Sequence, residues 1–319
     1  MANVMLTAVG SFSTNAAISS LKKDGHKVFG CDIYPKEWLY DAYEVDKFFQ
    51  APYACMTEEY KRFIFDICAE NKIEFLLPST DIEIDVLSGE NERLKASGTI
   101  LCISSDETIR ICRNKLLLSE KLISAKIPFI IPSVRAQNAE FTGQVLFAKP
   151  LNGRGSVGCR MVKSKDDLCS ISCSESNYII QPYIDGYIIA ADVARDKTGN
   201  CVSVLRRELI RDKSGAGKTV EIIENKGIED RCQQIAEYLN TLGVVNMEFI
   251  VDEMGNAWFM EVNPRFGGGV GYSCMAGYDM IKNHIIAFAG GKIEKKNTIS
   301  HLTIARRYIE RVTKKEIKE

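Results

Sequence analysis

The sequence has few of the residues that build metal centres or disulfide scaffolds. It contains three histidines, and its eleven cysteines are scattered singly with no Cys-x-x-Cys pair. The nearest approach, Cys169 and Cys173, lacks partner ligands in the sequence. A structural zinc ion takes four thiolate or imidazole ligands, so no zinc site is expected. An odd number of thiols without a signal peptide predicts a reduced, cytoplasmic protein.

Long hydrophobic runs and an excess of one charge are also missing. No segment approaches the ~20 apolar residues of a membrane span. Lys and Arg together number 41 against 42 for Asp and Glu, which gives a net charge of −1. This balance argues against a nucleic-acid or membrane-surface partner. Small-molecule chemistry is therefore expected, and a homodimer is compatible with the composition.

The chain divides into three consecutive blocks. Residues 1–105 alternate strand and helix patterns with short links, which predicts a Rossmann-like parallel sheet in an α/β fold. Residues 106–184 begin with a helical connector at 106–125 and continue as a small mixed sheet. Residues 185–319 contain longer strands and form the third block. The tail from Arg306 to Glu319 mixes charges at helical spacing, which predicts a solvated terminal helix.

A glycine-rich loop, Gly153-Arg154-Gly155-Ser156-Val157-Gly158, matches the pattern GxGxxG. A dinucleotide site needs a strand before this pattern and a helix after it, but here both flanking segments are strand-like. A glycine-rich turn between two strands instead predicts a flap whose backbone N–H groups close over phosphates. Lys149, at the end of the first strand, would direct a cation at the same phosphates. The loop alone fits a plain hairpin turn equally well.

Two other glycine patterns indicate different nucleotide sites, and both are incomplete. Ser214–Thr219 resembles the end of a Walker A loop, but the pattern needs glycine at position 212, which is Asp212, and the segment continues as a strand. Gly10 followed by Asp32 resembles the ribose-binding unit of a dehydrogenase, although the other two glycines are missing. We reject the Walker A loop and keep nicotinamide binding as a minor alternative.

The strongest chemical signal is a predicted hairpin between Asn246 and Arg265. Its turn at Asp252–Asn256 includes Gly255 and Asn256, which tolerate positive φ. If Val251 pairs with Trp258, Glu248 lies opposite Glu261, and strand alternation defines two faces. One face is expected to carry the functional groups: Asn246, Glu248, Ile250, Phe259, Glu261 and Asn263. The other is apolar and is expected to pack on helices: Met247, Phe249, Val251, Trp258, Met260 and Val262.

Two carboxylates opposed across a hairpin lie ~5 Å apart at Cβ. Two like charges ~4 Å apart repel by about 4 kcal/mol at an effective dielectric near 20, so a compensating cation is expected. Glu248, Glu261 and the Asn263 amide are hard oxygen ligands that suit Mg²⁺ carrying nucleotide phosphates. Arg265 adds a fixed cation for a transferring phosphoryl group. The alternative is a surface hairpin with solvated glutamates, and a one-residue slip would separate the two carboxylates.

Taken in order, these motifs resemble the ATP-grasp superfamily, which includes D-alanine–D-alanine ligase, biotin carboxylase and the carbamoyl phosphate synthetase large chain. The resemblance covers nearly the whole chain and by subtype is closest to stand-alone carbamoyl-phosphate-synthetase-like proteins. It implies two α+β lobes that clasp ATP behind the Rossmann-like domain. The motifs are Leu77-Pro-Ser-Thr-Asp81, Arg113-Asn-Lys115, Phe147-Ala-Lys149-Pro, the glycine loop, Ile180-Gln181-Pro-Tyr-Ile-Asp-Gly186 and Met260-Glu261-Val-Asn263-Pro-Arg265-Phe-Gly-Gly-Gly.

The resemblance also implies an activity and a role for each motif. A carboxylate, such as that of an amino acid, would react with ATP to give an acyl phosphate, which an amine would then attack. ATP and Mg²⁺ would be the cofactors, with two metal ions that Mn²⁺ can replace. The residues implicated are Lys115, Lys149 and Gly153–Gly158 for the phosphates; Gln181, Pro182, Tyr183 and Ile184 for adenine; Glu248, Glu261 and Asn263 for the metal; and Arg265 with Lys149 for catalysis.

Two departures from the family pattern concern the nucleotide. Ile188 stands where a glutamate usually binds the ribose, and Pro182 removes a backbone donor at the adenine hinge. Neither change touches the metal or phosphate groups, so we favour an active ligase. The alternatives are a kinase, a nucleotide-binding module without ligase activity, and an NAD-dependent enzyme.

The acceptor side of the reaction is expected around Arg206, Arg211, Lys218 and Gly268. An arginine there would clamp a substrate carboxylate with two hydrogen bonds. Gly268, within Gly267–Gly269, would let the substrate approach the backbone closely.

Overall fold

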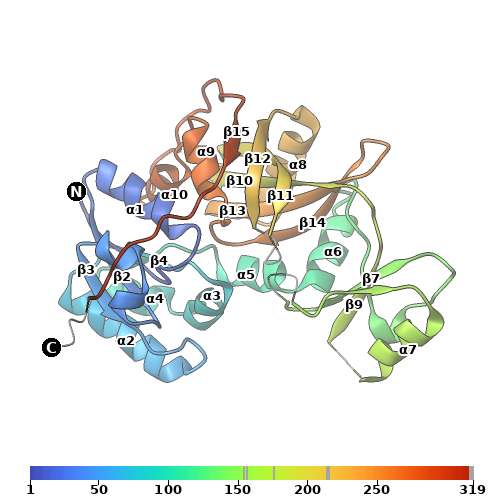
Figure 1. The fold of residues 1–319 in the computed structure, drawn as a ribbon, viewed down its shortest axis with the longest axis horizontal. Coiled ribbons are helices and arrows are strands. Elements are labelled where there is room, and N and C mark those ends of the chain that lie inside the picture. The colour runs from blue at the N-terminus through green and yellow to red at the C-terminus, as the bar shows by residue number, and fades with distance from the viewer. Residues whose placement is uncertain (154, 156, 175–176, 213–215, 316–319) are drawn as a thin grey trace.

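The first hundred residues form a five-stranded parallel sheet in the order β3-β2-β1-β4-β5 (Figure 1). The computed structural model describes residues 1–153, 155, 157–174, 177–212 and 216–315. Every strand pair in this sheet is parallel, which confirms the Rossmann-like prediction. The strands are β1 (Asn3–Leu6), β2 (Lys27–Asp32), β3 (Lys47–Gln50), β4 (Phe75–Leu77) and β5 (Ile100–Leu101). The helices are α1 (Thr14–Lys23), α2 (Thr57–Glu70), α3 (Asp81–Leu87) and α4 (Asn91–Ala96), with 3-10 turns η1 (Lys36–Trp38) and η2 (Asp41–Tyr43).

Alternation along the central strand β1 explains why this sheet is covered on both faces. Val4 and Leu6 belong to the core that includes α1 and the C-terminal helices, whereas Met5 packs in the core formed with α2 and α3. All three residues are fully buried. A parallel strand of this kind has an apolar side chain at every position because neither face meets water.

The predicted helical connector at 106–125 is two helices, not one. They are α5 (Asp106–Arg113) and α6 (Lys115–Ser124), separated at Asn114. Asn114 has extended backbone angles, and its side chain accepts a hydrogen bond from the Leu117 N–H. This is an N-cap, which asparagine forms more readily than it continues a helix. The break makes Lys115 the first residue of α6.

A small antiparallel sheet follows, in the order β6-β9-β7-β8, where a mixed sheet was expected. Its strands are β6 (Val134–Arg135), β7 (Leu146–Pro150), β8 (Arg160–Val162) and β9 (Tyr178–Pro182), with η3 (Ala136–Asn138) and α7 (Lys165–Ser174). Ala148, Val162 and Ile180 pack with Leu168 and Ile171 of α7 in a separate small core. This lobe lies apart from the other two sheets at the right of Figure 1.

The C-terminal half forms a six-stranded antiparallel sheet in the order β14-β13-β10-β11-β12-β15. α5, α6 and α8 contribute to the core on one face, and α9 and α10 to the core on the other. The strands are β10 (Tyr187–Arg195), β11 (Cys201–Arg211), β12 (Gly217–Ile223), β13 (Gly243–Val251), β14 (Ala257–Asn263) and β15 (Thr303–Ala305). The helices are α8 (Lys226–Tyr238), α9 (Val270–Met275) and α10 (Met280–Phe288).

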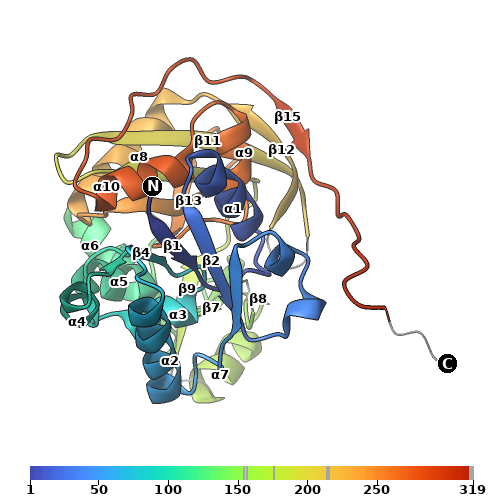
Figure 2. The same ribbon diagram turned by 90° about the vertical axis from the view of Figure 1, so that its left-hand side faces the viewer.

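The predicted terminal helix is wrong for the part of the tail that the structure describes. Residues 306–315 have no helical structure and run from β15 along the N-terminal lobe (Figure 2). Arg311 pairs with Glu44 at 2.6 Å, and the Tyr43 hydroxyl donates to the Thr313 carbonyl at 2.9 Å. Arg311 and the backbone of Thr313 thus have partners in the N-terminal domain, which helical periodicity in the sequence does not reveal. None of the helices described here has the length and apolar character needed to cross a bilayer.

Candidate functional site

A cavity of about 830 Å³ is lined by residues from all three sheets and their loops. The large sheet contributes the predicted carboxylates Glu248 and Glu261, and the small sheet contributes Lys149. The N-terminal domain contributes Asp32, the last residue of β2, and Asp81, the first residue of α3. A cavity of this volume lies in the range of small-molecule sites.

The predicted opposition of the two glutamates is confirmed. β13 and β14 pair antiparallel, with Glu248 opposite Glu261 and Asn246 opposite Asn263. The outer half of the hairpin differs from the prediction by one residue, because Val251 pairs with Ala257 and not with Trp258. The register therefore shifts once, between Glu248 and the next residue.

This shift changes the faces assigned to three side chains of β14. Met260 is the extra residue, as in a β-bulge, and it lines the cavity beside Glu261. Phe259 turns instead into the core, where its ring centroid lies 5.6 Å from that of Phe249. Trp258 packs edge-on against Phe129, outside that core. The predicted faces of these three residues were wrong because strict alternation does not continue through a bulge.

The two glutamates have opposite electrostatic surroundings. Burial, reinforced by the charge of Glu261, raises the pKa of Glu248 to about 7, although Arg211 opposes the rise. Burial alone would raise the Glu261 pKa as well, but Lys115 and then Lys149 hold that pKa below its ordinary value. Burial therefore disfavours the charged form of Glu248, whereas the two lysines stabilise the charged form of Glu261.

Both predicted phosphate lysines lie beside Glu261. Lys115 Nζ is 3.7 Å from Glu261 Oε2 and donates to the Gly153 carbonyl at 2.9 Å, so it links the carboxylate to the glycine loop. Lys149 on β7 is 7% exposed, and its burial lowers the pKa of its amine. Two ammonium groups beside one carboxylate leave net positive charge available for an anionic ligand.

The glycine loop joins two antiparallel strands, β7 and β8, as the flap prediction required. Gly153, Gly155 and Val157 line the cavity, whereas Arg154 and Ser156 lie outside the described residues. Gly158 has φ of +78° and is not among the lining residues; its carbonyl accepts from the Tyr178 hydroxyl. A strand on each side excludes the strand–loop–helix arrangement of a dinucleotide fingerprint.

The predicted adenine hinge lies at the end of β9, and its four residues are not among those lining the cavity. The Gln181 side chain is buried and donates to the Ser133 hydroxyl at 2.8 Å. Pro182 lies opposite Leu146, and the Tyr183 N–H donates to the Val145 carbonyl. Ile184 follows in the link to β10, where Ile188 pairs with Ile250.

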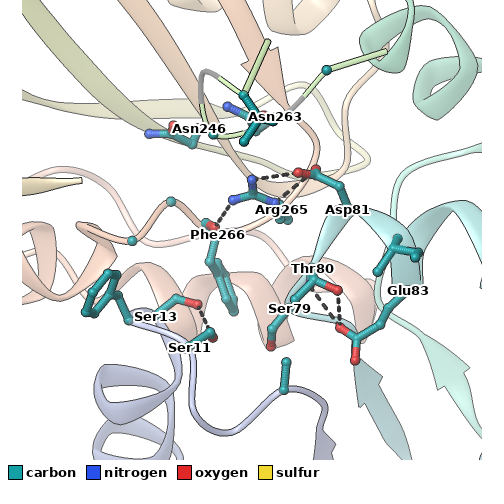
Figure 3. A pocket seen from close by; sticks show the side chains of 18 of the residues that line it. Ser11, Ser13, Ser79, Thr80, Asp81, Glu83, Asn246, Asn263, Arg265 and Phe266 are labelled. Carbon is teal, nitrogen blue, oxygen red and sulfur yellow. Dashed lines mark hydrogen bonds and ion pairs between the residues drawn. The ribbon is translucent and has the colours of Figure 1, made fainter. Parts of the chain in front are cut away.

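Arg265 lines the cavity, and an acidic residue of the N-terminal lobe holds it in place. Its Nε and Nη2 donate to the two carboxylate oxygens of Asp81 at 3.0 and 2.8 Å, and its Nη1 donates to the Phe266 carbonyl (Figure 3). Burial would raise the pKa of Asp81, but Arg265 and then Arg113 hold it below its ordinary value. This contact is not evident from the sequence, because the motif Leu77-Pro-Ser-Thr-Asp81 does not by itself indicate an arginine partner for Asp81.

The four predicted substrate residues separate into two pairs. Arg211 and Gly268 line the cavity. Arg211 pairs with Glu208 at 2.5 Å and with Glu248 at 3.1 Å. Arg206 and Lys218 are not among the lining residues.

The position of Arg206 explains its separation from the cavity. It is 3% exposed and pairs with the buried Asp192 at 2.6 Å. A Cβ at Gly269 would lie 2.6 Å from Arg206 Nε, so this position admits only glycine unless the arginine moves. Arg206 therefore packs against the backbone of Gly269, within the segment Gly267–Gly269.

Several cavity residues of the N-terminal lobe were not predicted as site residues. Ser11 and Ser13 follow β1, and Ser79 and Glu83 follow β4 (Figure 3). Asp32 is the last residue of β2 and also lines the cavity. What could have identified them in the sequence is their position at or after the carboxyl ends of predicted parallel strands, where ligands of such sheets bind.

The candidate metal ligands are Glu248, Glu261 and Asn263, which all line the cavity. The Asn263 amide donates to Glu261 Oε1 at 3.3 Å. Within the described part of the chain, no three His, Cys, Asp or Glu side chains form a metal cluster, so any site here depends on two carboxylates and one amide. Hard oxygen ligands, among them a buried Glu248 carboxylate whose charge a cation would stabilise, fit Mg²⁺, which keeps several waters or phosphate oxygens in its shell.

Comparison with known proteins gives two family matches on separate parts of the chain. Residues 4–102 match the family described as PylC-like, N-terminal domain. Residues 174–311 match the family described as ATP-grasp in the biosynthetic pathway with Ter operon.

Curated relatives are similar over part of their length. The arginine-specific carbamoyl phosphate synthase large chain of Bacillus subtilis is 23% identical over 273 residues, which is 80% of this chain and 26% of the relative. Chloroplastic biotin carboxylase 2 of Populus trichocarpa is 25% identical over 219 residues, 60% of this chain and 41% of the relative. The chain thus spans about a quarter to two-fifths of these proteins.

Solved structures share the fold at low sequence identity. Biotin carboxylase from Campylobacter jejuni aligns with a TM-score of 0.77 at 17% identity, over 94% of this chain and 74% of that one. N5-carboxyaminoimidazole synthetase from Staphylococcus aureus, in complex with ADP, aligns with a TM-score of 0.74 at 18% identity, over 94% and 80% of the two chains.

Proposed function

We propose that this protein is an ATP-dependent, ADP-forming carboxylate–amine ligase. Residues 174–311 match an ATP-grasp family model, and the chain shares its fold with a biotin carboxylase and an N5-carboxyaminoimidazole synthetase, which supports the proposal. The proposed ligase converts a small-molecule carboxylate and ATP into an acyl phosphate, which an amine then attacks. We propose three domains for this work, at 1–105, 106–184 and 185–319. The three sheets lie within these ranges, which supports the division.

One observation carries the proposal: the opposed carboxylates Glu248 and Glu261 share a cavity with Lys115, Lys149 and Arg265. Phosphoryl transfer needs positioned charge more than it needs a covalent enzyme nucleophile. Acidic oxygens suit a metal ion, and cations on either side suit the phosphates and the developing acyl phosphate. A purely structural hairpin has no need for five ionisable groups facing one cavity.

Each of these residues has a separate task. Lys115 and Lys149 neutralise phosphate oxygens, and the loop containing Gly153 and Gly155 covers them with backbone N–H groups. Glu248, Glu261 and Asn263 would hold Mg²⁺. When bound, that ion would neutralise phosphate charge and orient the transferring group.

Arg265 is the proposed stabiliser of the acyl phosphate. Asp81 holds its guanidinium in one plane through two hydrogen bonds, so Arg265 needs little reorganisation to meet developing charge. Asp81 acts here as a positioning residue. Because Asp81 follows β4, the N-terminal domain contributes directly to the geometry of the site.

A trapping assay tests the proposal. The protein is incubated with Mg-ATP, a panel of carboxylic acids including amino acids, and hydroxylamine, which intercepts an acyl phosphate as a hydroxamate. A ligase gives hydroxamate and ADP in equal amounts, both dependent on the acid. ADP release without trapped acid would indicate a kinase, and Mg-ADP binding without turnover would indicate a nucleotide-binding module.

Glu261→Ala provides the matched variant for this assay. Hydroxamate formation is expected to fall to background while the cooperative unfolding transition is retained. Glu253→Ala, at an exposed position in the turn of the same hairpin, should retain the activity. Full activity in Glu261→Ala would remove the metal assignment.

A further inference from the structure

The cavity continues beyond the proposed phosphate groups to the carboxyl edge of the N-terminal sheet. The sheet order β3-β2-β1-β4-β5 means that the chain moves outward from β1 in one direction and from β4 in the other. Such a reversal opens a crevice between the loops that follow the two central strands, and ligands of open α/β sheets bind there. Residues after β1 (Ser11, Ser13) and β4 (Ser79) line the cavity at this point.

Asp32, at the end of β2, is an acidic group of this region without a cationic partner among the described residues. Its two carboxylate oxygens accept from the Gly10 and Tyr34 backbone N–H groups at 3.0 and 3.1 Å. The side chain lines the cavity, and the residue is 7% exposed. Gly10 permits this approach, since a Cβ there would lie 3.3 Å from Asp32 Oδ2 and 2.9 Å from Leu39.

The other acidic groups of the cavity differ from Asp32 in their partners. Asp81 pairs with Arg265, Glu248 with Arg211, and Glu261 with Lys115. These pairs engage three of the lining cations within the described chain.

Glu83 is a different case. It is buried among hydroxyl donors from Thr7, Tyr60 and Thr80, and its burial raises the pKa of its carboxyl. These hydroxyls and the Thr80 N–H donate to both of its carboxylate oxygens, so the hydrogen-bonding needs of Glu83 are met without a cation. Among the acidic groups that line the cavity, Asp32 is therefore the one that a cationic group of a ligand would stabilise most.

A primary ammonium group has the right chemistry for this position. It carries three donors, and a nearly buried carboxylate forms a strong charge-assisted hydrogen bond with it. The Ser11 and Ser13 hydroxyls, whose oxygens are 3.2 Å apart, also line the cavity and can accept hydrogen bonds from the other N–H groups of the ammonium. Tyr34 and Tyr53 add aromatic walls for the rest of a small molecule.

We propose that this end of the cavity binds the ammonium group of an amine-bearing substrate, an amino acid, with Asp32 as its counter-ion. The inference rests on the proposed function, because the other end of the same cavity is where a carboxylate would be activated. The main competing ligand is a ribose diol, which an aspartate at the end of a second strand binds in nicotinamide enzymes.

Matched pairs of ligands test the ammonium directly. Binding is measured in the presence of Mg-ADP for glycine and for the other proteinogenic amino acids in both enantiomers. Their deamino acids are measured alongside, such as 4-methylpentanoate against leucine. At least one amino acid should bind at least about tenfold more tightly than its deamino partner, as expected for a hydrogen bond between charged groups. This comparison uses the unaltered protein.

Asp32→Asn should remove that difference while changing the affinity for Mg-ADP less than about threefold. Asp46→Asn is the control, since Asp46 also accepts a backbone N–H, from Val28 at 2.7 Å, but does not line the cavity. Equal binding of amino and deamino acids, an unchanged preference in Asp32→Asn, stabilisation by NAD, or no binding by any amino acid would each overturn the proposal. Failure to bind Mg-ADP would count against the proposed function instead.

Discussion

Replacing Glu248 by glutamine should make the metal-free protein more stable, although it removes a proposed metal ligand. The substitution keeps the shape of the side chain and removes one of two carboxylates that face each other across β13 and β14. Glu261 retains Lys115 and Lys149, and Arg211 retains Glu208 at 2.5 Å. The variant therefore leaves both Glu261 and Arg211 with an oppositely charged partner.

The size of the gain follows from the Glu248 pKa, which burial and Glu261 raise from 4.5 to about 7. At about 1.4 kcal/mol for each pH unit, this corresponds to roughly 3 kcal/mol against the folded state above pH 7. The side chain is 18% exposed, and solvent screening reduces the expected gain to about 1–3 kcal/mol at pH 8. As the pH falls from 7 towards 4.5, folded Glu248 takes up its proton first, so the gain disappears.

Urea unfolding in EDTA, followed by tryptophan fluorescence at pH 8 and pH 5, measures this difference. Glu253→Gln in the exposed turn is the control and should match the parent protein at both values. Mg-ADP should stabilise the parent and the control but raise the stability of Glu248→Gln much less. A variant that is less stable at pH 8, or equally stabilised at pH 5, would show that the two carboxylates do not repel in the folded protein.

Three further changes test other parts of the site and its support. Lys149→Met should retain the fold and lower the rate of acid-dependent ADP release by about 100-fold, measured in a coupled assay, because a buried phosphate cation is lost. Asp81→Asn should cost about 1–3 kcal/mol in urea unfolding, since Arg265 loses its charged partner, and should also slow hydroxamate formation. Burial lowers the pKa of His284 to about 3, so an unfolded chain with the ordinary value near 6.5 binds the proton first and stability falls below that pH. His284→Gln should remove about 2 kcal/mol of the stability lost between pH 7.5 and 5, read from unfolding curves at both values.

Local patterns in the sequence predicted the elements of the fold well. The N-terminal sheet followed from strand–helix alternation, and the loop at Gly153–Gly158 from strands on both sides of it. The connector failed at Asn114, where one side chain that caps a helix outweighs the helical pattern around it. β3 (Lys47–Gln50) was not predicted, because an edge strand of four partly exposed residues has no strong apolar alternation.

Contacts between distant segments could not be predicted in the same way. Asp81 and Arg265 are 184 positions apart, and neither residue type by itself indicates the other as a partner. The same holds for Arg311 and Glu44, which turn an expected helix into an extended tail. A general rule about parallel sheets would have identified Asp32 and Ser79 as cavity residues, but it does not say which side chains carry the chemistry.

The bulge in β14 lets Phe259 pack in the core while Glu261, two residues later, faces the cavity. In strict alternation Phe259 and Glu261 face the same way, so either the ring enters the cavity or the carboxylate enters the core. Burying a phenylalanine contributes about 1.5–3 kcal/mol, whereas burying an unpaired carboxylate costs more than that. One extra residue, Met260, lets Phe259 pack against Phe249 while Glu261 stays opposite Glu248. The bulge thus accommodates Met260 as an extra residue without moving Glu261 away from Glu248. Deleting Met260 should keep Glu261 in the cavity and retain acid-dependent ADP release, because Phe259 and Glu261 would then be neighbours in a regular strand and face opposite sides.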